Sequence, residues 1–261
     1  MGASASKWQN AGSTGPLASP MQLSATEELI PTRRRTWDAE ELLGARGERI
    51  RRPSDEVLAR LRDELLHDAV TEFDGRLLTE HVESLPYELS PAARAAFEIW
   101  DGDERRHHLG FRLTLDALYD DVEPEIERFA ERRADFGPLK EFFGEEFTLL
   151  LLGAYDELCT VRGYRKNLPL YDELGPEFGR YVRHVIADEA WHYSLFLGVL
   201  RREHSHRRDE TAAWLERIRA AEATPYAATF VLDHDDKELY SDEIGAAAER
   251  ILMRQFGHAR G

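Results

Sequence analysis

The sequence has little cysteine, no long apolar run and a deficit of positive charge. Its single cysteine, Cys159, excludes an internal disulfide framework and every metal site built from several thiolates, and it favours a reducing compartment such as the cytoplasm. The longest apolar stretch, around residues 147–155, falls short of the roughly 20 residues that a membrane-spanning helix needs. We therefore expect a cytoplasmic protein with no membrane span.

The charge balance argues against polyanionic partners. The chain has 50 acidic and 34 basic residues, a net charge of -16, which repels nucleic acid and anionic lipid. Its 261 residues, 42% of them hydrophobic, are enough to build a sizeable core. Nucleic acid is therefore not an expected partner, and a globular protein is.

The apolar pattern is helical along most of the chain. Residues 1–35 are rich in Gly, Ser, Ala and Pro and are expected to form a disordered leader. The rest, 36–261, is expected to be a single helical domain, with a core bundle at about 53–205 and a C-terminal helical extension at 206–261. Long helices are predicted at 53–85, 90–121, 137–167 and 175–205, and shorter ones near 123–134, at about 209–223 and at the C-terminal end after a Ser241 cap.

The lengths of these helices indicate the architecture. Strand signals are nearly absent, and a helix of about 30 residues is about 45 Å long, which suits a four-helix bundle. The predicted fold class is thus all-α, a four-helix bundle with additional C-terminal helices.

Two of the long helices share a D-E-x-x-H pattern. Asp103, Glu104 and His107 repeat in the order of Asp188, Glu189 and His192. Residues i and i+3 lie on one helix face, so each Glu and His can point at one metal ion. The two Asp residues could then accept hydrogen bonds from the imidazole rings, across the bundle, and fix their tautomers. Alternatively each Asp only solvates its helix.

A bridged two-metal site needs one more carboxylate from each of the other two long helices. Glu72 lies 32 residues before Glu104 (104 - 72), and Glu157 lies 32 residues before Glu189 (189 - 157). Equal offsets are what two antiparallel helix pairs require if all four residues meet in one layer. Other acids compete for these roles, namely Glu64, Glu80, Glu145, Glu146 and Asp156.

The E-x-x-H spacing alone is weak evidence, because it occurs four times. Glu64 and His67 form a third D-E-x-x-H, and Glu203 and His206 form a fourth E-x-x-H in a polar segment. For any one of them, a solvated helix face explains the pattern. The paired motifs on the second and fourth long helices are the stronger signal.

Over residues 54–200 these motifs resemble the ferritin-like non-haem diiron oxygenases and oxidases, and most closely the acyl-carrier-protein desaturases. The similar segments are DAVTEFD at 68–74, DERRHH at 103–108, ELCT at 157–160 and DEAWHYS at 188–194, with Trp191 where the family has Arg. The resemblance implies a ferritin-like bundle, two Fe ions and O2 as co-substrate, and it favours Glu72 over Glu64. It gives Thr160 a catalytic role beside bound oxygen. A Thr bonded to the carbonyl four residues back is the alternative.

Four carboxylates and two imidazoles neutralise two divalent ions and leave open positions. These donors suit iron, manganese or a mixed pair. The resemblance implies a two-electron oxidation, either hydroxylation or desaturation, and natural-product or fatty-acyl metabolism is the expected setting. The expected substrate is a small molecule or an acyl group on an acidic carrier protein. No G-x-G-x-x-G fingerprint is present, so an external ferredoxin or reductase is implied. A homodimer is compatible with the resemblance.

Departures from related patterns rank the alternatives. Phe111 occupies the position at which the small subunits of ribonucleotide reductases carry a radical tyrosine. A phenylalanine there argues against the radical role. An N-oxygenase needs an extra His where Val185 stands, and His184, one residue away, would reach the site only through a π-bulge. A non-catalytic iron-binding bundle is a further alternative. Apolar residues near the motifs are candidate walls of a substrate pocket: Phe97, Trp100, Phe111, Leu150, Leu151, Ala154, Tyr155, Trp191 and Phe196.

Overall fold

The computed structural model describes residues 36–120, 122, 124–126, 128, 135–223, 232 and 242–257. Within these ranges every regular element is a helix, which confirms the all-α class. The predicted leader at 1–35 and the predicted cap Ser241 lie outside the described residues, and so does most of the predicted helix at 123–134.

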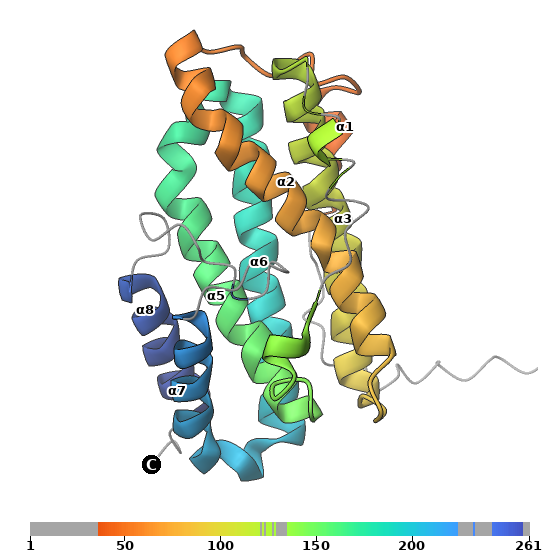
Figure 1. The fold of residues 1–261 in the computed structure, drawn as a ribbon, viewed down its shortest axis with the longest axis vertical. Coiled ribbons are helices and arrows are strands. Elements are labelled where there is room, and N and C mark those ends of the chain that lie inside the picture. Colours follow the sequence, from red (N-terminus) through yellow and green to blue (C-terminus); the bar gives the residue numbers. More distant parts are fainter. Residues whose placement is uncertain are drawn as a thin grey trace, which may run out of the picture.

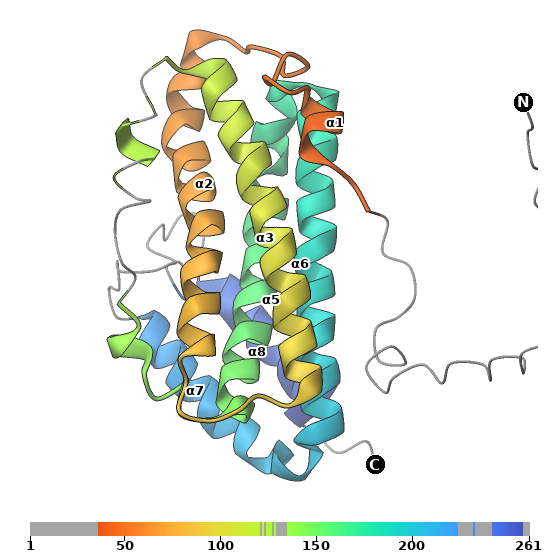
Figure 2. The same cartoon turned by 90° about the vertical axis from the view of Figure 1, so that its right-hand side faces the viewer.

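Four long helices lie side by side and form a bundle (Figures 1 and 2). They are α2 (Asp55–Glu83), α3 (Pro91–Leu118), α5 (Glu146–Tyr171) and α6 (Pro176–Glu203). α2 packs on α3, α5 packs on α6, and α3 also packs on α6. Short connections join α2 to α3 and α5 to α6, so the helices of each pair run antiparallel.

Shorter elements cover the two ends of the bundle. α1 (Ala39–Leu43) packs on α3 and α6 at one end. α7 (Thr211–Glu222) and α8 (Asp242–Leu252) pack on α5 toward the other end (Figure 1). The remaining elements are 3-10 turns at Gly137–Leu139, Asp172–Leu174 and Ser205–Glu210, and a π-helical turn at Met253–Gly257.

The starts of α2 and α3 follow from their capping residues. The Ser54 side chain accepts a hydrogen bond from the backbone N–H of Val57, and the Ser90 side chain accepts one from the backbone N–H of Ala93. Pro91 follows Ser90 in the first turn of α3. A serine in this position stabilises a helix start by about 1 kcal/mol. Both helices begin within two residues of their predicted starts, because these predictions depended on the capping residues, and they end within three residues of their predicted ends.

The start of α5 differs from the prediction. The sequence pattern predicts a helix from 137, but Gly137–Leu139 is a 3-10 turn and the α-helix begins only at Glu146. The segment contains Pro138 and Gly144, and glycine costs about 1 kcal/mol in a helix interior. At its other end α5 runs past the predicted 167 and through Pro169 to Tyr171. There the Tyr171 hydroxyl donates to Asp68 of α2 at 2.6 Å.

The apolar core is divided in two. One cluster of buried side chains includes Phe97, Leu151 and Phe196 and extends under α7 and α8. The other includes Leu61, Phe111 and Val182 and extends under α1. On each long helix the change from one cluster to the other falls at the predicted ligands, so a polar layer separates two apolar halves.

Among the described residues, no helix combines the length and the apolar character that crossing a bilayer requires.

Candidate metal centre

Six side chains from the four long helices meet in the polar layer between the two apolar clusters. All are buried: Glu72, Glu104, His107, Glu157, Glu189 and His192. Both imidazoles are fully inaccessible. Burying ionisable groups costs free energy unless they are paired or coordinate a metal, so a layer of this composition in a helical core requires a physical explanation.

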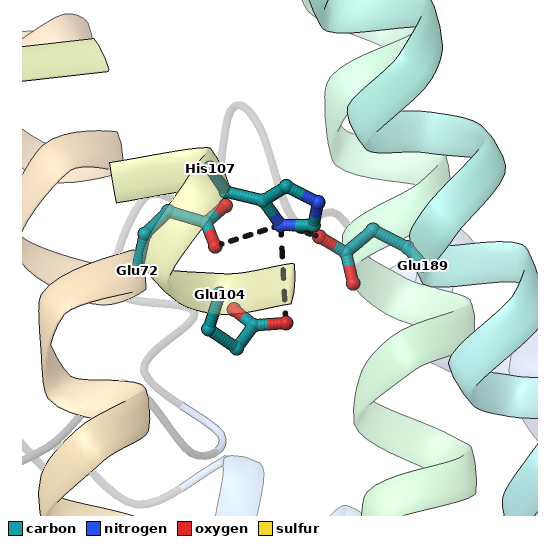
Figure 3. A group of neighbouring side chains, drawn as sticks. All are labelled: Glu72, Glu104, His107 and Glu189. Carbon is teal, nitrogen blue, oxygen red and sulfur yellow. Dashed lines mark hydrogen bonds and ion pairs between the residues drawn. The ribbon is translucent and has the colours of Figure 1, made fainter. Parts of the chain in front are cut away.

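The first group of ligand atoms centres on His107 (Figure 3). Its Nδ1 lies 3.2 Å from an oxygen of Glu72, 3.1 Å from Glu189 and 3.8 Å from Glu104. One ligand atom from each of these four residues lies within 4.8 Å of the others. Three carboxylates and one imidazole therefore face a common point that a single cation can occupy.

The second group has the same composition and centres on His192. Its Nδ1 lies 3.0 Å from an oxygen of Glu189, 3.4 Å from Glu104 and 3.5 Å from Glu157. Glu104 and Glu189 belong to both groups. A carboxylate has two oxygens, so these two glutamates can bridge a pair of ions, while the other ligands bind one ion each.

Three carboxylate oxygens of the layer lack a hydrogen bond, and they test whether two metal ions fit the site. Glu104 Oε1, Glu157 Oε2 and Glu189 Oε1 are buried and have no hydrogen-bond partner. A buried polar atom without a partner costs about 1–3 kcal/mol. Each of the three lies 3.1–3.5 Å from the Nδ1 atom of an imidazole without a hydrogen bond to it, so two cations would satisfy carboxylate oxygens whose printed contacts are these ion pairs. The donor set fits two divalent metal ions.

The protonation equilibria reflect crowded negative charge. Burial, followed by the charge of Glu189, raises the pKa of both Glu104 and Glu157 well above their usual range. Burial alone would lower the pKa of each imidazole, but neighbouring carboxylates outweigh it. They raise the pKa of His107 well above its usual range and that of His192 to about 9. Burial would raise the pKa of Glu189, but both imidazolium rings lower it. Without metal, the raised pKa values therefore favour protons on the two imidazoles and on Glu104 and Glu157, and these protons offset the crowded negative charge.

Metal binding is accordingly expected to release protons and to tighten as pH rises. Ligands with a raised pKa hold protons near neutral pH and must lose them to bind a cation. The stability of the metal-free protein should change in the opposite direction. A raised pKa in the folded state contributes stability below the unfolded value, 6.5 for His192, and this contribution is lost as pH rises through the folded value of about 9.

Two measurements test this linkage. Proton release can be followed with an indicator dye during anaerobic Fe(II) titration, and metal-free stability can be followed by urea unfolding at pH 6.5 and 9. A metal-free protein that becomes more stable with rising pH, or metal binding without proton release, would contradict the assigned protonation states.

The two aspartates face the imidazoles across the bundle, as the repeated motif predicted. Each aspartate contacts the histidine of the other motif and not the one on its own helix. His192 Nε2 lies 3.0 Å from Asp103, and His107 Nε2 lies 3.4 Å from Asp188. Each ring therefore turns its Nε2 toward an aspartate and its Nδ1 toward the centre, which is how a carboxylate fixes the orientation of a metal-binding imidazole. Arg106 donates to Asp103 and lies 3.9 Å from Asp188, so one guanidinium faces both carboxylates.

Three aromatic residues beside the first group were not predicted from the sequence. Trp37 donates its indole N–H to Asp188 at 2.8 Å and stacks on His107 with an interplanar angle of 8°. Tyr164 donates to Glu72, and Tyr181 donates to the backbone carbonyl of His107. No motif identifies them, because each contact joins segments far apart in the sequence.

Thr160, predicted as a catalytic residue, has a contact on its own helix instead. Its hydroxyl donates to the carbonyl of Asp156 at 3.1 Å. This is the back-bond to the preceding turn that threonine commonly makes in helices. Among the described residues no hydrogen bond joins Thr160 to the six-residue layer, so its only described bond is the structural one.

The competing acids lie elsewhere. Glu80 is exposed, Glu145 and Glu146 are half-buried at the start of α5, and Asp156 accepts from the backbone N–H of Leu232 at 3.0 Å. Glu64 accepts from Asn167 at 3.1 Å. Of the four E-x-x-H pairs, only the two on α3 and α6 contribute to the metal groups found among the described residues.

Gly75 on α2 permits the close approach of Glu104. A Cβ atom at this position would lie 3.0 Å from the Cβ and Cγ of Glu104 and 3.3 Å from the Trp100 ring. These separations are shorter than ordinary van der Waals contact. A glycine opposite Glu104, which belongs to both four-residue groups, therefore allows α2 and α3 to pack at the spacing that the layer needs.

The comparisons with known proteins returned no match to a family model, to a curated protein or to a solved structure.

Proposed function

We propose that this chain is an O2-activating non-haem diiron oxidoreductase with a ferritin-like bundle, which hydroxylates or desaturates an organic substrate. The observation that carries the proposal is the pair of four-residue groups that share Glu104 and Glu189. Each group offers three carboxylates and one imidazole. Such a set in the core of a four-helix bundle is typical of bridged di-metal carboxylate sites.

The chemistry of the donors supports a redox-active pair. When bound, two iron ions would supply O2 activation and two-electron oxidation, and hard oxygen ligands favour their oxidised state. The protein residues orient the imidazoles through Asp103 and Asp188, exclude water from a layer that is buried throughout, and hold the protons that metal binding displaces. Manganese accepts the same donors, so metal analysis has to identify the ions.

Electrons and substrate come from outside the chain in this proposal. The sequence has no flavin or nicotinamide fingerprint, so a ferredoxin or a separate reductase is the proposed donor. The proposed setting is the cytoplasm, in keeping with the single cysteine.

The N-oxygenase alternative needs a distortion that α6 lacks. It requires a π-bulge that turns His184 toward the metals. α6 is a continuous α-helix from Pro176 to Glu203, and His184 stacks on Trp37 at a centroid distance of 5.4 Å. This geometry favours oxidation of carbon over oxidation of an amine nitrogen.

Anaerobic titration with Fe(II) tests the proposal directly. The wild-type protein is expected to bind about two ions per chain, because the layer contains two four-residue groups. After removal of free metal, the loaded protein should consume O2 and, with an electron donor, oxidise an organic substrate. Iron binding without O2 consumption would support a non-catalytic iron-binding bundle, and no iron binding would refute the metal centre itself.

A further inference from the structure

The second D-E-x-x-H motif lacks the arginine of the first. Arg106 precedes His107 on α3, whereas Trp191 precedes His192 at the matching position of α6. Among the described residues the buried indole N–H of Trp191 has no hydrogen-bond partner, and its ring packs against the apolar cluster that extends under α7 and α8. The two aspartates of the motifs therefore have one motif arginine between them.

Arg106 reaches both aspartates with the same nitrogen. Its Nη2 donates to Asp103 and lies 3.9 Å from Asp188. The side chains of the two aspartates are only 3% and 6% exposed, so this nitrogen faces two carboxylates that are almost shielded from water. A charge-assisted hydrogen bond is about twice as strong as a neutral one, and removing the partner of a buried charge is strongly destabilising. The position of both carboxylates therefore depends on one cation.

Each aspartate in turn contacts the imidazole of the opposite motif. Asp103 accepts from Arg106 with one oxygen and lies 3.0 Å from His192 with the other. Asp188 lies 3.4 Å from His107. This gives two branches, Asp103 with His192 and Asp188 with His107. The guanidinium is linked to each four-residue metal group by one aspartate and one imidazole.

Trp37 belongs to the branch of Asp188 and His107. Its indole N–H donates to Asp188 at 2.8 Å, and its ring stacks on His107. The guanidinium of Arg106 lies over the same indole, 5.3 Å from the ring centroid. A change at Trp37 should therefore act on one branch, whereas a change at Arg106 should act on both.

Resting on the proposed function, we propose that Arg106 is a positioning residue shared by the two metal groups. It holds both aspartates, and through them it holds both imidazole rings. Partners of metal ligands contribute about 10–100-fold to metal affinity. Because one charge serves both branches, its loss should weaken both metal groups together, which the loss of a contact on a single branch cannot do.

Arg106→Met tests the shared charge, because methionine keeps an apolar side chain beside Trp37 but has neither the charge nor the donors. Competition with a fluorescent chelator measures the affinity of each site for Zn(II), which accepts carboxylate and imidazole ligands. Both affinities are expected to fall at least about tenfold. Arg106→Lys keeps the charge, and it should stay within about threefold of wild type because the contact is not bidentate. If the lysine variant behaved like the methionine variant, lost packing would explain the effect and the proposal would be wrong.

The ring N–H protons of the two histidines report position separately from affinity. In isotope-labelled protein loaded with Zn(II), the Nε2–H signals of His107 and His192 should be shifted downfield and exchange slowly, because each bonds to an aspartate. In Arg106→Met both protons are expected to exchange at least about tenfold faster, and in Trp37→Phe only that of His107 should do so. A change in one signal alone for Arg106→Met, or in both for Trp37→Phe, would overturn the proposal.

Arg105→Met is the matched control. Arg105 is the neighbouring arginine on α3, its side chain is 62% exposed, and it pairs with Asp101 at 2.9 Å. This variant should leave both Zn(II) affinities and both ring signals unchanged. If Arg106→Met does not fold, Arg106→Gln is measured in its place, because it removes the charge but keeps a donor for Asp103.

The outcomes for Arg106 and for the proposed function are separable, since these measurements use neither iron nor O2. Zn(II) binding that depends on Arg106, in a protein that consumes no O2 after loading with Fe(II), would refute the proposed function and leave the role of Arg106 standing. Consumption of O2 by wild type, together with unchanged ring signals in Arg106→Met, would refute the role of Arg106 alone.

Discussion

Glu189→Ala is expected to abolish binding of both metal ions, whereas Glu72→Ala is expected to remove only one. Glu189 belongs to both four-residue groups and lies 3.1 Å from one imidazole and 3.0 Å from the other. Its loss leaves each ion with three of its four protein ligands. Glu72 belongs to one group only, so the group around His192 stays complete. Even outer residues of metal sites contribute about 10–100-fold to affinity, and a direct ligand should contribute more.

Bound iron per chain, measured after anaerobic loading and removal of free Fe(II), distinguishes the two variants. The ratios expected are near zero for Glu189→Ala and about one for Glu72→Ala, against about two for wild type. The matched control is the double change of Glu64 and His67 to alanine, because this pair has the same D-E-x-x-H pattern and lies outside both groups. Loss of iron in the control, or equal losses in both glutamate variants, would show that the shared carboxylates do not bridge two ions.

The six side chains of the layer could be predicted from the sequence because their signal is repeated and periodic. Glu and His three residues apart must share a helix face, and the offsets of 32 residues place Glu72 and Glu157 at matching depth. Sequence spacing is enough for such a prediction when straight antiparallel helices convert it into height along the bundle. The structure brings all six side chains together as this reasoning predicted.

Contacts between distant segments could not be predicted in this way. Trp37 lies just before α1 and reaches Asp188, which is 151 positions away in the chain. Tyr164 lies two turns after Glu157 on α5 and donates to Glu72 of α2. Neither residue belongs to a periodic motif, because its role depends on how the helices pack and not on a spacing along one helix. The error at the start of α5 has a local cause instead, since Pro138 and Gly144 interrupt a pattern that otherwise reads as helical.

The polar layer is a source of instability when no metal is bound. The four glutamates, with Asp103 and Asp188, supply six carboxylates, against two imidazoles and the guanidinium of Arg106. If every group were ionised, six negative and three positive charges would leave a net charge of -3 in a buried space. Removing one carboxylate should therefore relieve repulsion and leave enough negative charge to pair with both imidazoles, provided that its hydrogen bonds are kept.

Glu157→Gln meets this condition and should stabilise the metal-free protein by about 1–3 kcal/mol while weakening iron binding. The amide oxygen can still accept the Trp100 N–H that Glu157 accepts at 2.7 Å. His192 keeps Glu189 and Asp103, each at 3.0 Å. Since burial raises the pKa of Glu157 well above its usual range, the carboxyl is neutral at low pH. The gain in the free energy of unfolding should therefore be small near pH 5, and it should grow as pH rises through the folded-state pKa of Glu157.

Urea unfolding of metal-free wild type and Glu157→Gln across this pH range measures the effect, and iron analysis measures its functional cost. Glu64→Gln is the matched control, because Glu64 is only half-buried, bonds to Asn167 at 3.1 Å and lies outside both metal groups. A change within about 0.5 kcal/mol is expected for it, because the amide oxygen of glutamine can still accept the hydrogen bond from Asn167. If Glu157→Gln destabilised the metal-free protein at alkaline pH, the ionised carboxylate would be a net stabilising partner of His192. The polar layer would then be a structural ion-pair network, able to hold the bundle together without any metal.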